Sequence, residues 1–145
     1  MTDVAFHFGA PDKIAYACRL LRKAVRAGSR AVVIVNAAQI NQLDADLWAV
    51  APTDFVAHCL DTADANLQQR SPVILTTAAH PTLAPRPLLV NLSDTMPQAF
   101  EKFTRLIEVV SQDEADRSLA RQRWKQYTER GYALIKHDLQ LKGAN

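Results

Sequence analysis

A row of cations beside an aromatic residue is the group in this sequence best suited to binding chemistry. Arg117, Arg121 and Lys125 recur at every fourth position, and residues four apart lie on one face of a helix. Trp124 stands three positions after Arg121 and borders the row. Such a surface holds a carboxylate by charge-assisted hydrogen bonds and receives an apolar group beside it. It predicts a site for a short acidic peptide with an aromatic end, or for a nucleic-acid strand whose bases stack.

A structural interpretation of the same segment stays open, in which Trp124 and Tyr127 pack on a sheet while the cations face water. Charge is concentrated here, because residues 117–130 hold five basic side chains against Glu129 alone. Residues 1–30 are also cationic, with six basic side chains against two acidic ones. The formal net charge of the whole chain is only +2. Each basic segment is therefore either a solvated helix face or the contact for an anionic partner.

The sequence offers no arrangement of residues that is typical of an enzyme. The turn at residues 8–12 contains one glycine, whereas a dinucleotide-binding turn needs three, and no Gly-Lys-Ser/Thr phosphate loop is present. Asp44 and Asp46 would diverge on a helix, and no serine lies in a Gly-x-Ser-x-Gly elbow. The four histidines are too scattered to share a metal: His7, His58, His80 and His137. We therefore expect no catalytic residue, no metal site and no cofactor.

Composition is typical of a globular protein with one domain. The 145 residues are 48% hydrophobic and 22% charged, which is enough to bury a core without disulfides. Cys18 and Cys59 lie in apolar contexts, so we expect both to be small buried side chains. No apolar run approaches the roughly 20 residues that span a bilayer, and the N-terminus lacks a signal-peptide pattern. A cytoplasmic location without membrane contact is the default expectation.

Apolar periodicity predicts strands that alternate with helices. Residues 31–35 are continuously apolar and β-branched, which is typical of a strand covered on both faces. Asp12 and Gly28 are residue types that begin and end helices, and the apolar residues between them recur at helical spacing. The predicted strands are 4–8, 31–35, 55–60, 73–77, 88–92 and 106–110, and the predicted helices are 12–28, 38–50, 98–104 and 113–130.

This alternation indicates an α/β fold with a mostly parallel sheet flanked by helices and a long C-terminal helix. We expect a single α/β domain over residues 1–131. Residues 132–145 are expected to form a loosely ordered C-terminal tail.

Several segments together resemble the chi subunit family of bacterial DNA polymerase III. The run from Arg121 to Tyr127, followed by Gly131 and Tyr132, is similar to the family pattern Ala-Arg-x-Arg-aromatic-Lys/Arg-x-Tyr and then Gly-aromatic. Further matches extend over nearly the whole chain: Phe6, Gly28 with Arg30, Leu47-Trp48-Ala49, Asp54-Phe55-Val56 with His58, Leu88 to Leu92, and Phe100. No single motif is specific, but their order and spacing together are.

The resemblance implies a Rossmann-like fold and a non-catalytic adaptor role within the DNA polymerase III holoenzyme. Chi subunits bind the psi subunit, which links them to the clamp loader. They also bind the acidic C-terminal tail of the single-stranded DNA-binding protein, which ends in phenylalanine, so their contact with single-stranded DNA is indirect. Carried over by position, the tail site comprises Arg117, Arg121, Trp124 and Lys125.

The resemblance also implies a psi interface that includes Trp48 and Phe55, which from the residues alone are equally plausible as core side chains. Two other functions stay open. A direct single-stranded nucleic-acid-binding module would use the two basic segments, although the modest net charge argues against it. A small enzyme of unknown type is the second, because a fold does not fix a function.

Overall fold

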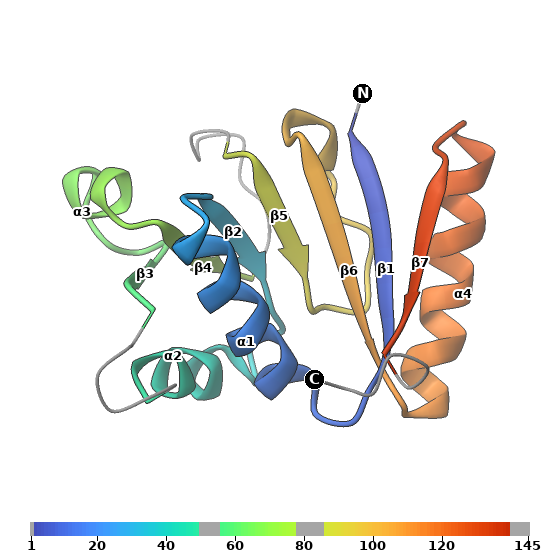
Figure 1. Cartoon of the computed structure of the whole chain (residues 1–145), viewed down its shortest axis with the longest axis horizontal. Coiled ribbons are helices and arrows are strands. Elements are labelled where there is room, and N and C mark those ends of the chain that lie inside the picture. The colour runs from blue at the N-terminus through green and yellow to red at the C-terminus, as the bar shows by residue number, and fades with distance from the viewer. Residues whose placement is uncertain (1, 50–55, 78–85, 140–145) are drawn as a thin grey trace.

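The computed structural model describes residues 2–49, 56–77 and 86–139. Within them, one sheet of seven parallel strands has the order β3-β4-β2-β5-β6-β1-β7 (Figure 1). The strands are β1 (Asp3–Ala10), β2 (Ala31–Ile34), β3 (His58–Leu60), β4 (Val73–Thr76), β5 (Leu88–Asn91), β6 (Arg105–Ser111) and β7 (Leu134–Asp138). The helices are α1 (Lys13–Arg26), α2 (Ile40–Trp48), α3 (Ala65–Arg70) and α4 (Glu114–Glu129), with a 3₁₀ turn η1 (Phe100–Lys102). The predicted α/β, Rossmann-like fold with a long C-terminal helix is confirmed.

Alternate residues of the strands face opposite sides of the sheet and build two cores. Val33 and Val90 belong to the core that includes α1 and α2. Val32 and Leu89 belong to the core that includes α4, as the pleat of a strand requires. Every residue of β2 is buried, so the continuous apolar run in this segment reflects a strand that is covered on both faces.

Aspartate side chains fix where three of the helices begin. Asp12, Asp64 and Asp113 each accept a hydrogen bond from a backbone N–H in the first turn of α1, α3 and α4 respectively. These bonds satisfy amides that have no partner within the helix. The predicted helix starts at Asp12 and Asp113 are confirmed. None of the helices in the described ranges is long and apolar enough to cross a membrane.

β7 occupies a segment that the sequence predicts as a loosely ordered tail. Residues 134–138 pair in parallel with residues 4–8 of β1. Gly131 follows α4 with φ at +91°, a conformation that glycine adopts without steric cost, and the chain turns back toward the sheet there. The expectation of a loose tail is wrong for residues 134–138, because β1 supplies backbone partners that a mainly polar sequence pattern does not reveal.

Two other elements differ from the predicted pattern. The helix predicted over residues 98–104 is only the single 3₁₀ turn η1. The helix α3 was not predicted, because none of its residues is buried and it has no apolar periodicity to detect. The strand predicted over residues 55–60 begins at His58 in the structure, and Phe55 lies outside the described residues.

Both cysteines behave as small core side chains. Cys18 and Cys59 are free and buried, as the sequence predicts. Burial, with nearby carboxylates, raises the pKa of the Cys18 thiol to about 11. The thiol therefore stays protonated and unreactive at neutral pH.

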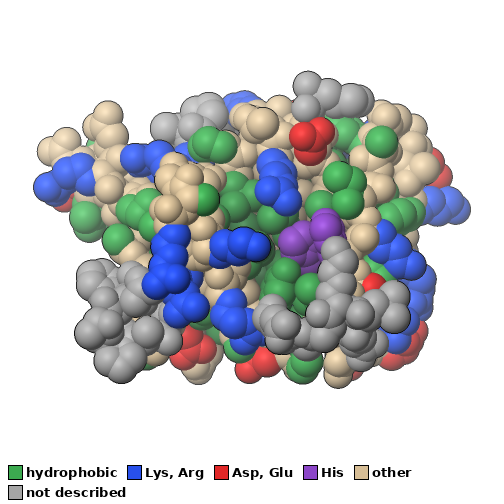
Figure 2. Space-filling model, in the orientation of Figure 1, with side chains coloured by type: hydrophobic (Ala, Val, Ile, Leu, Met, Phe, Trp, Pro, Cys, Tyr) green, Lys and Arg blue, Asp and Glu red, His purple; other side chains and the backbone are tan. Residues whose placement is uncertain are grey.

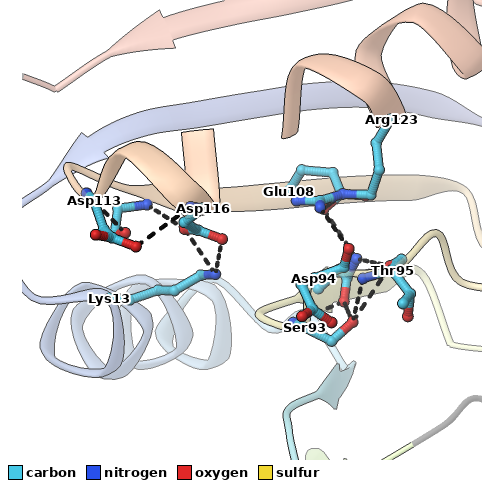
Figure 3. A network of polar contacts seen from close by, with 10 residues as sticks. Lys13, Ser93, Asp94, Thr95, Glu108, Asp113, Asp116 and Arg123 are labelled. Atoms are coloured by element: carbon cyan, nitrogen blue, oxygen red, sulfur yellow. Dashed lines mark hydrogen bonds and ion pairs between the residues drawn. The ribbon is translucent and has the colours of Figure 1, made fainter. Parts of the chain in front are cut away.

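Asp116 joins the start of α4 to α1 and to the end of β6 (Figure 3). Its carboxylate accepts a hydrogen bond from the Ser111 backbone N–H at 2.8 Å and forms an ion pair with Lys13 Nζ at 3.1 Å. Burial by itself would raise the pKa of Asp116, but the Ser111 N–H and the Lys13 ammonium outweigh burial and lower it. An acid with a lowered pKa stabilises the fold above its unfolded pKa, and this contribution is lost as pH falls through the folded pKa.

Asp116→Asn should therefore lower the free energy of unfolding at neutral pH by about 1.5 kcal/mol, the scale of one hydrogen bond to a charged group. The difference from the unchanged chain should shrink below about pH 4, where the unfolded carboxyl takes up its proton. Urea unfolding followed by circular dichroism at neutral and acid pH measures both effects. Glu129→Gln, at an exposed position of the same helix, is the control. An equal loss of stability at both pH values would contradict this role of Asp116.

Candidate functional site

A pocket of about 440 Å³ opens between α4 and the strands β1, β6 and β7. Three of the side chains that line it are exposed cations, Arg117 and Arg121 from α4 and Lys136 from β7. The other lining residues are apolar and buried or half-buried: Phe6, Phe8, Val110, Ala120 and Trp124. Cations around an apolar pocket suit a ligand that carries negative charge and an apolar group together.

The aromatic wall of the pocket is held by contacts with the sheet. The Trp124 ring lies on Phe6, with the ring centroids 5.1 Å apart and the planes tilted by 58°. Phe8 lies further along β1, and Lys136 Nζ lies 4.9 Å from the centroid of the Phe8 ring, which is a cation–π distance. Trp124 and Phe8 pack against the core without being fully buried. Their remaining surface is therefore available to an apolar ligand group.

The cations keep most of their solvent exposure. Arg121 Nη2 lies 2.7 Å from Glu114 Oε1, and the two side chains are 61% and 74% exposed. The hydrogen bond from Arg121 and the charge of its guanidinium lower the pKa of Glu114. Ion pairs this exposed are weak, so an incoming carboxylate can replace Glu114 at Arg121. Arg117 forms no ion pair with any residue in the described ranges.

Three of the four residues predicted for a binding site therefore meet in one pocket. Arg117, Arg121 and Trp124 line it, whereas Lys125 is exposed and does not. The reason is geometric, because a step of four residues turns a helix by about 40° beyond a full turn. The cationic row consequently rotates away from the pocket as it approaches Lys125.

Sequence reasoning missed the contribution of the two strands. Phe6 and Phe8 read simply as residues of a buried strand, and Lys136 falls in the segment predicted as a tail. The segment from Leu134 to Asp138 has two apolar residues followed by three polar ones, without the alternation that signals a half-buried strand. This pattern could not reveal which strand β7 pairs with, and that pairing is what brings Lys136 to Phe8.

A buried polar network sets the rotation of α4 against the sheet (Figure 3). Glu108 on β6 is fully buried and accepts hydrogen bonds from Arg123 Nε at 3.2 Å, Tyr127 Oη at 2.6 Å and Asn91 Nδ2 at 2.9 Å. Burial raises the pKa of Glu108, an effect that Arg123 opposes. Burial and the Glu108 carboxylate also raise the pKa of Tyr127, so its hydroxyl remains a donor at neutral pH.

The same network removes Arg123 from the cationic surface. Its side chain is 3% exposed, and its Nη1 donates to the Asp94 backbone carbonyl at 2.9 Å. One of the five basic residues in the 117–130 segment is thus structural. Tyr127 is likewise a core residue, fully buried against Phe100, as the structural interpretation predicts. Trp124 also packs on the sheet, against Phe6, but stays half-buried.

A second candidate surface surrounds Trp48, the last residue of α2. Its side chain is 53% exposed, and its ring centroid lies 4.8 Å from that of the buried His58. Both ring nitrogens of His58 face acceptors, with Nε2 2.7 Å from Asp44 Oδ1 and Nδ1 directed at the Val56 carbonyl. Trp48 is therefore not a core residue. Phe55, predicted for the same surface, lies outside the described residues.

The parallel sheet and the cationic, aromatic pocket define an α/β protein with a surface site suited to anionic ligands. Residues 1–135 match the family described as DNA polymerase III chi subunit, HolC. A relative from Pseudomonas aeruginosa, named DNA polymerase III subunit chi, is 34% identical over 128 residues, which cover 88% of this chain and 87% of the relative. A relative of the same name from Haemophilus influenzae is 32% identical over 119 residues, which cover 81% of each chain.

The chain therefore belongs to the DNA polymerase III chi subunit family. This family supplies a subunit of a DNA polymerase complex, so the chain has an accessory role in DNA replication. The resemblance noted in the sequence is confirmed.

A solved structure shows how far the fold extends beyond the family. The similar chain comes from a complex of Saccharomyces cerevisiae Dbp5 with Nup159, Gle1, IP6 and ADP. The TM-score is 0.63 at 12% sequence identity, and the match covers 94% of this chain and 42% of that chain. At this identity the likeness shows the fold alone.

The buried network makes a prediction about stability. Arg123→Met would leave the Glu108 carboxylate buried without its ion-pair partner, and should lower the free energy of unfolding by about 3–5 kcal/mol. Adding Glu108→Leu should restore part of the loss, because the unpaired charge is then gone although the buried Tyr127 hydroxyl loses its acceptor. Urea unfolding of the single and double variants measures both effects. A single variant as stable as the unchanged chain would show that α4 is held by other contacts.

Proposed function

We propose that this chi-family chain is a non-catalytic adaptor subunit of the DNA polymerase III holoenzyme. It binds the acidic C-terminal tail of the single-stranded DNA-binding protein and is linked to the clamp loader through the psi subunit. Family membership supports the accessory role. The observation that carries the tail-binding proposal is the pocket at α4, where exposed cations surround an aromatic recess.

The chemistry of such a tail matches the pocket in two respects. A terminal phenylalanine ring would enter beside Phe8 and Trp124, and burying one such ring contributes about 1.5–3 kcal/mol. The terminal carboxylate and the acidic side chains before it would meet Arg117, Arg121 and Lys136. Because these cations come from both α4 and β7, the ring and the carboxylates can be held at the same time.

Glu114 acts in this proposal as an internal competitor for the tail. Its carboxylate occupies Arg121 in the unbound protein, so a tail carboxylate must displace it. The exchange replaces one exposed ion pair by another. Because of this exchange, the contact between the tail and Arg121 is weak, reversible and sensitive to salt.

Arg121→Ala should weaken the binding of a short acidic peptide ending in phenylalanine by roughly tenfold, since an exposed charge-assisted contact is lost. Lys136→Ala should weaken it by a similar factor. Glu114→Gln should strengthen it by roughly two- to threefold, because Arg121 no longer has an internal partner. Fluorescence anisotropy with the labelled peptide measures all three variants at one salt concentration.

Lys125→Ala is the matched control, because it removes a cation from the same helix but outside the pocket lining, and its effect should be smaller than that of Arg121→Ala. The same peptide with a C-terminal amide, or with alanine as its last residue, should bind less tightly. If neither peptide change nor Arg121→Ala affects binding, the tail does not use this pocket.

For the psi subunit, we propose contact through Trp48. Trp48 is one of the large apolar side chains that are exposed in the described residues, together with Leu67 and Ile135. Tryptophan in such a position is typical of a residue that contributes strongly to a protein interface. The packing of Trp48 on His58 gives the indole a defined orientation before any partner binds.

Trp48→Ala should weaken co-purification with the psi subunit, with little change in stability because the side chain is half in water. The interface loss should be about 2 kcal/mol or more, as for aromatic anchors in other complexes. Size-exclusion chromatography of the mixed subunits measures complex formation. Leu67→Ala, at an exposed apolar position on α3, is the control and should leave the complex intact.

A further inference from the structure

A second concave surface lies on the face of the sheet opposite the pocket beside α4, which is called the tail pocket below. This groove, of about 750 Å³, runs between α1 and the strands β5, β6, β1 and β7. Its floor includes Leu88 and Ile107, which belong to the core on the α1 side. The tail pocket is lined by Phe6 and Val110 from the core on the α4 side. The two surfaces are therefore separated by the sheet.

The walls of this groove are cationic. Four cations come from the last two turns of α1, and Arg105 comes from the start of β6. Figure 2 shows Lys and Arg side chains gathered over α1 with histidine side chains next to them. The α1 cations stand at helical spacings of three and four residues, so they form one stripe along the helix. They are Arg19, Arg22, Lys23 and Arg26.

Three of the four cations in this stripe form no ion pair in the part of the chain that the structure describes. The helix α1 contains no acidic residue, and no Asp or Glu is among the described residues that line the groove. Within the described ranges, Arg19, Arg22 and Lys23 form no ion pair, and neither does Arg105. Asp3 stands opposite Arg105 in the strand register. The repulsion among these like charges is tolerable only because the side chains reach into water, and an anionic ligand would relieve it.

The floor of the groove distinguishes between two kinds of anionic ligand. Leu88, Ile107 and Leu139 are only 5%, 2% and 9% exposed, so they leave little apolar surface to cover. Tyr16 is buried, and its hydroxyl lies 2.6 Å from His7 Nδ1, so its ring is not a stacking platform. Leu20 and Ala24 of α1 also line the groove and are half-buried, but no exposed phenylalanine, tyrosine or tryptophan ring lies among its described lining residues. The groove thus offers repeated positive charge without an aromatic recess. This suits a phosphate backbone better than an acidic peptide that ends in an aromatic residue.

We propose that the groove between α1 and strands β6 and β1 binds the phosphate backbone of single-stranded nucleic acid. Sequence-tolerant single-strand binders follow the backbone with a positively charged groove, to which stacking aromatic rings add affinity; in this groove the contact would be with the backbone alone. Arg19 and Lys23 on α1 are separated by about 6 Å along the helix axis, so they can contact neighbouring phosphates. The site lies away from the tail pocket, so both surfaces can be occupied at once.

The expected binding is weak, independent of sequence and strongly dependent on salt. Four phosphate contacts would give a slope of roughly −3 for log affinity against log salt concentration. Raising the salt from about 50 to about 200 mM would then weaken binding roughly 50-fold. Fluorescence anisotropy with a labelled oligothymidylate and the purified full chain measures this slope. No binding at low salt would overturn the proposal.

The decisive comparison uses two variants with the same loss of charge on opposite faces. Arg19→Ala with Lys23→Ala removes two exposed cations of the groove and should weaken oligothymidylate binding roughly tenfold and reduce the salt slope by roughly 1.4. Arg121→Ala with Lys125→Ala removes two exposed cations of α4 and should leave oligothymidylate binding unchanged. Circular dichroism of both variants verifies that they are folded. Loss of binding in the α4 variant alone would overturn the proposal.

Two further ligands test whether the groove prefers single-stranded nucleic acid. A duplex of the same length should bind less tightly than oligothymidylate, and equal or tighter binding of the duplex would overturn the single-strand assignment. The acidic peptide that ends in phenylalanine should bind equally well to the unchanged chain and to the α1 variant. If that peptide loses affinity in the α1 variant and oligothymidylate does not, the groove is a peptide site. Failure of peptide binding to the α4 pocket leaves these oligonucleotide outcomes unaffected.

Discussion

A fully buried carboxylate, that of Glu108, sits between the sheet and α4 and fixes the face that this helix presents. It accepts hydrogen bonds from Arg123, Tyr127 and Asn91, so it ties two turns of α4 to β6 and β5. A charge buried this deeply is tolerated only when donors surround it. The consequence reaches the surface, because with Arg123 and Tyr127 facing inward, Trp124 must stand at the edge of the core and Arg121 must face water.

The second constraint is the pairing of β7 with β1, which extends the sheet beyond β1. The added strand turns the surface beside α4 into a pocket with two cationic sides. It also carries His137 to the opposite face, where the groove beside α1 begins. One edge strand therefore contributes to both concave surfaces, and the period of two along a strand separates Lys136 from His137.

An accessory subunit of a polymerase complex works within an assembly, so the charge that its surface presents to other molecules matters. The modest net charge conceals two cationic regions that the sheet holds apart. One surrounds an aromatic recess, and the other lines a groove in which Tyr16, the one tyrosine among the described lining residues, is buried. The two proposed ligands therefore differ although both regions are cationic, because the side chains next to the cations decide which anionic ligand binds more tightly. Trp48, at the end of α2, offers a third surface whose character is apolar.

The sequence by itself determined the α/β fold, most strands, the helix starts at Asp12 and Asp113, and the position of Trp124 beside the cations Arg117 and Arg121 on one helix. These follow from local rules, because apolar period, capping chemistry and helical spacing act over a few residues. Only the tertiary structure decided that Arg123 is a buried ion-pair partner while Arg121 is exposed, that Lys125 turns out of the pocket, and that Lys136 enters it. Those outcomes depend on contacts between segments distant in sequence, above all Glu108 with α4 and β7 with β1. Residue type and spacing do not encode such pairings, since a buried and an exposed arginine read alike until the chain brings a carboxylate to one of them.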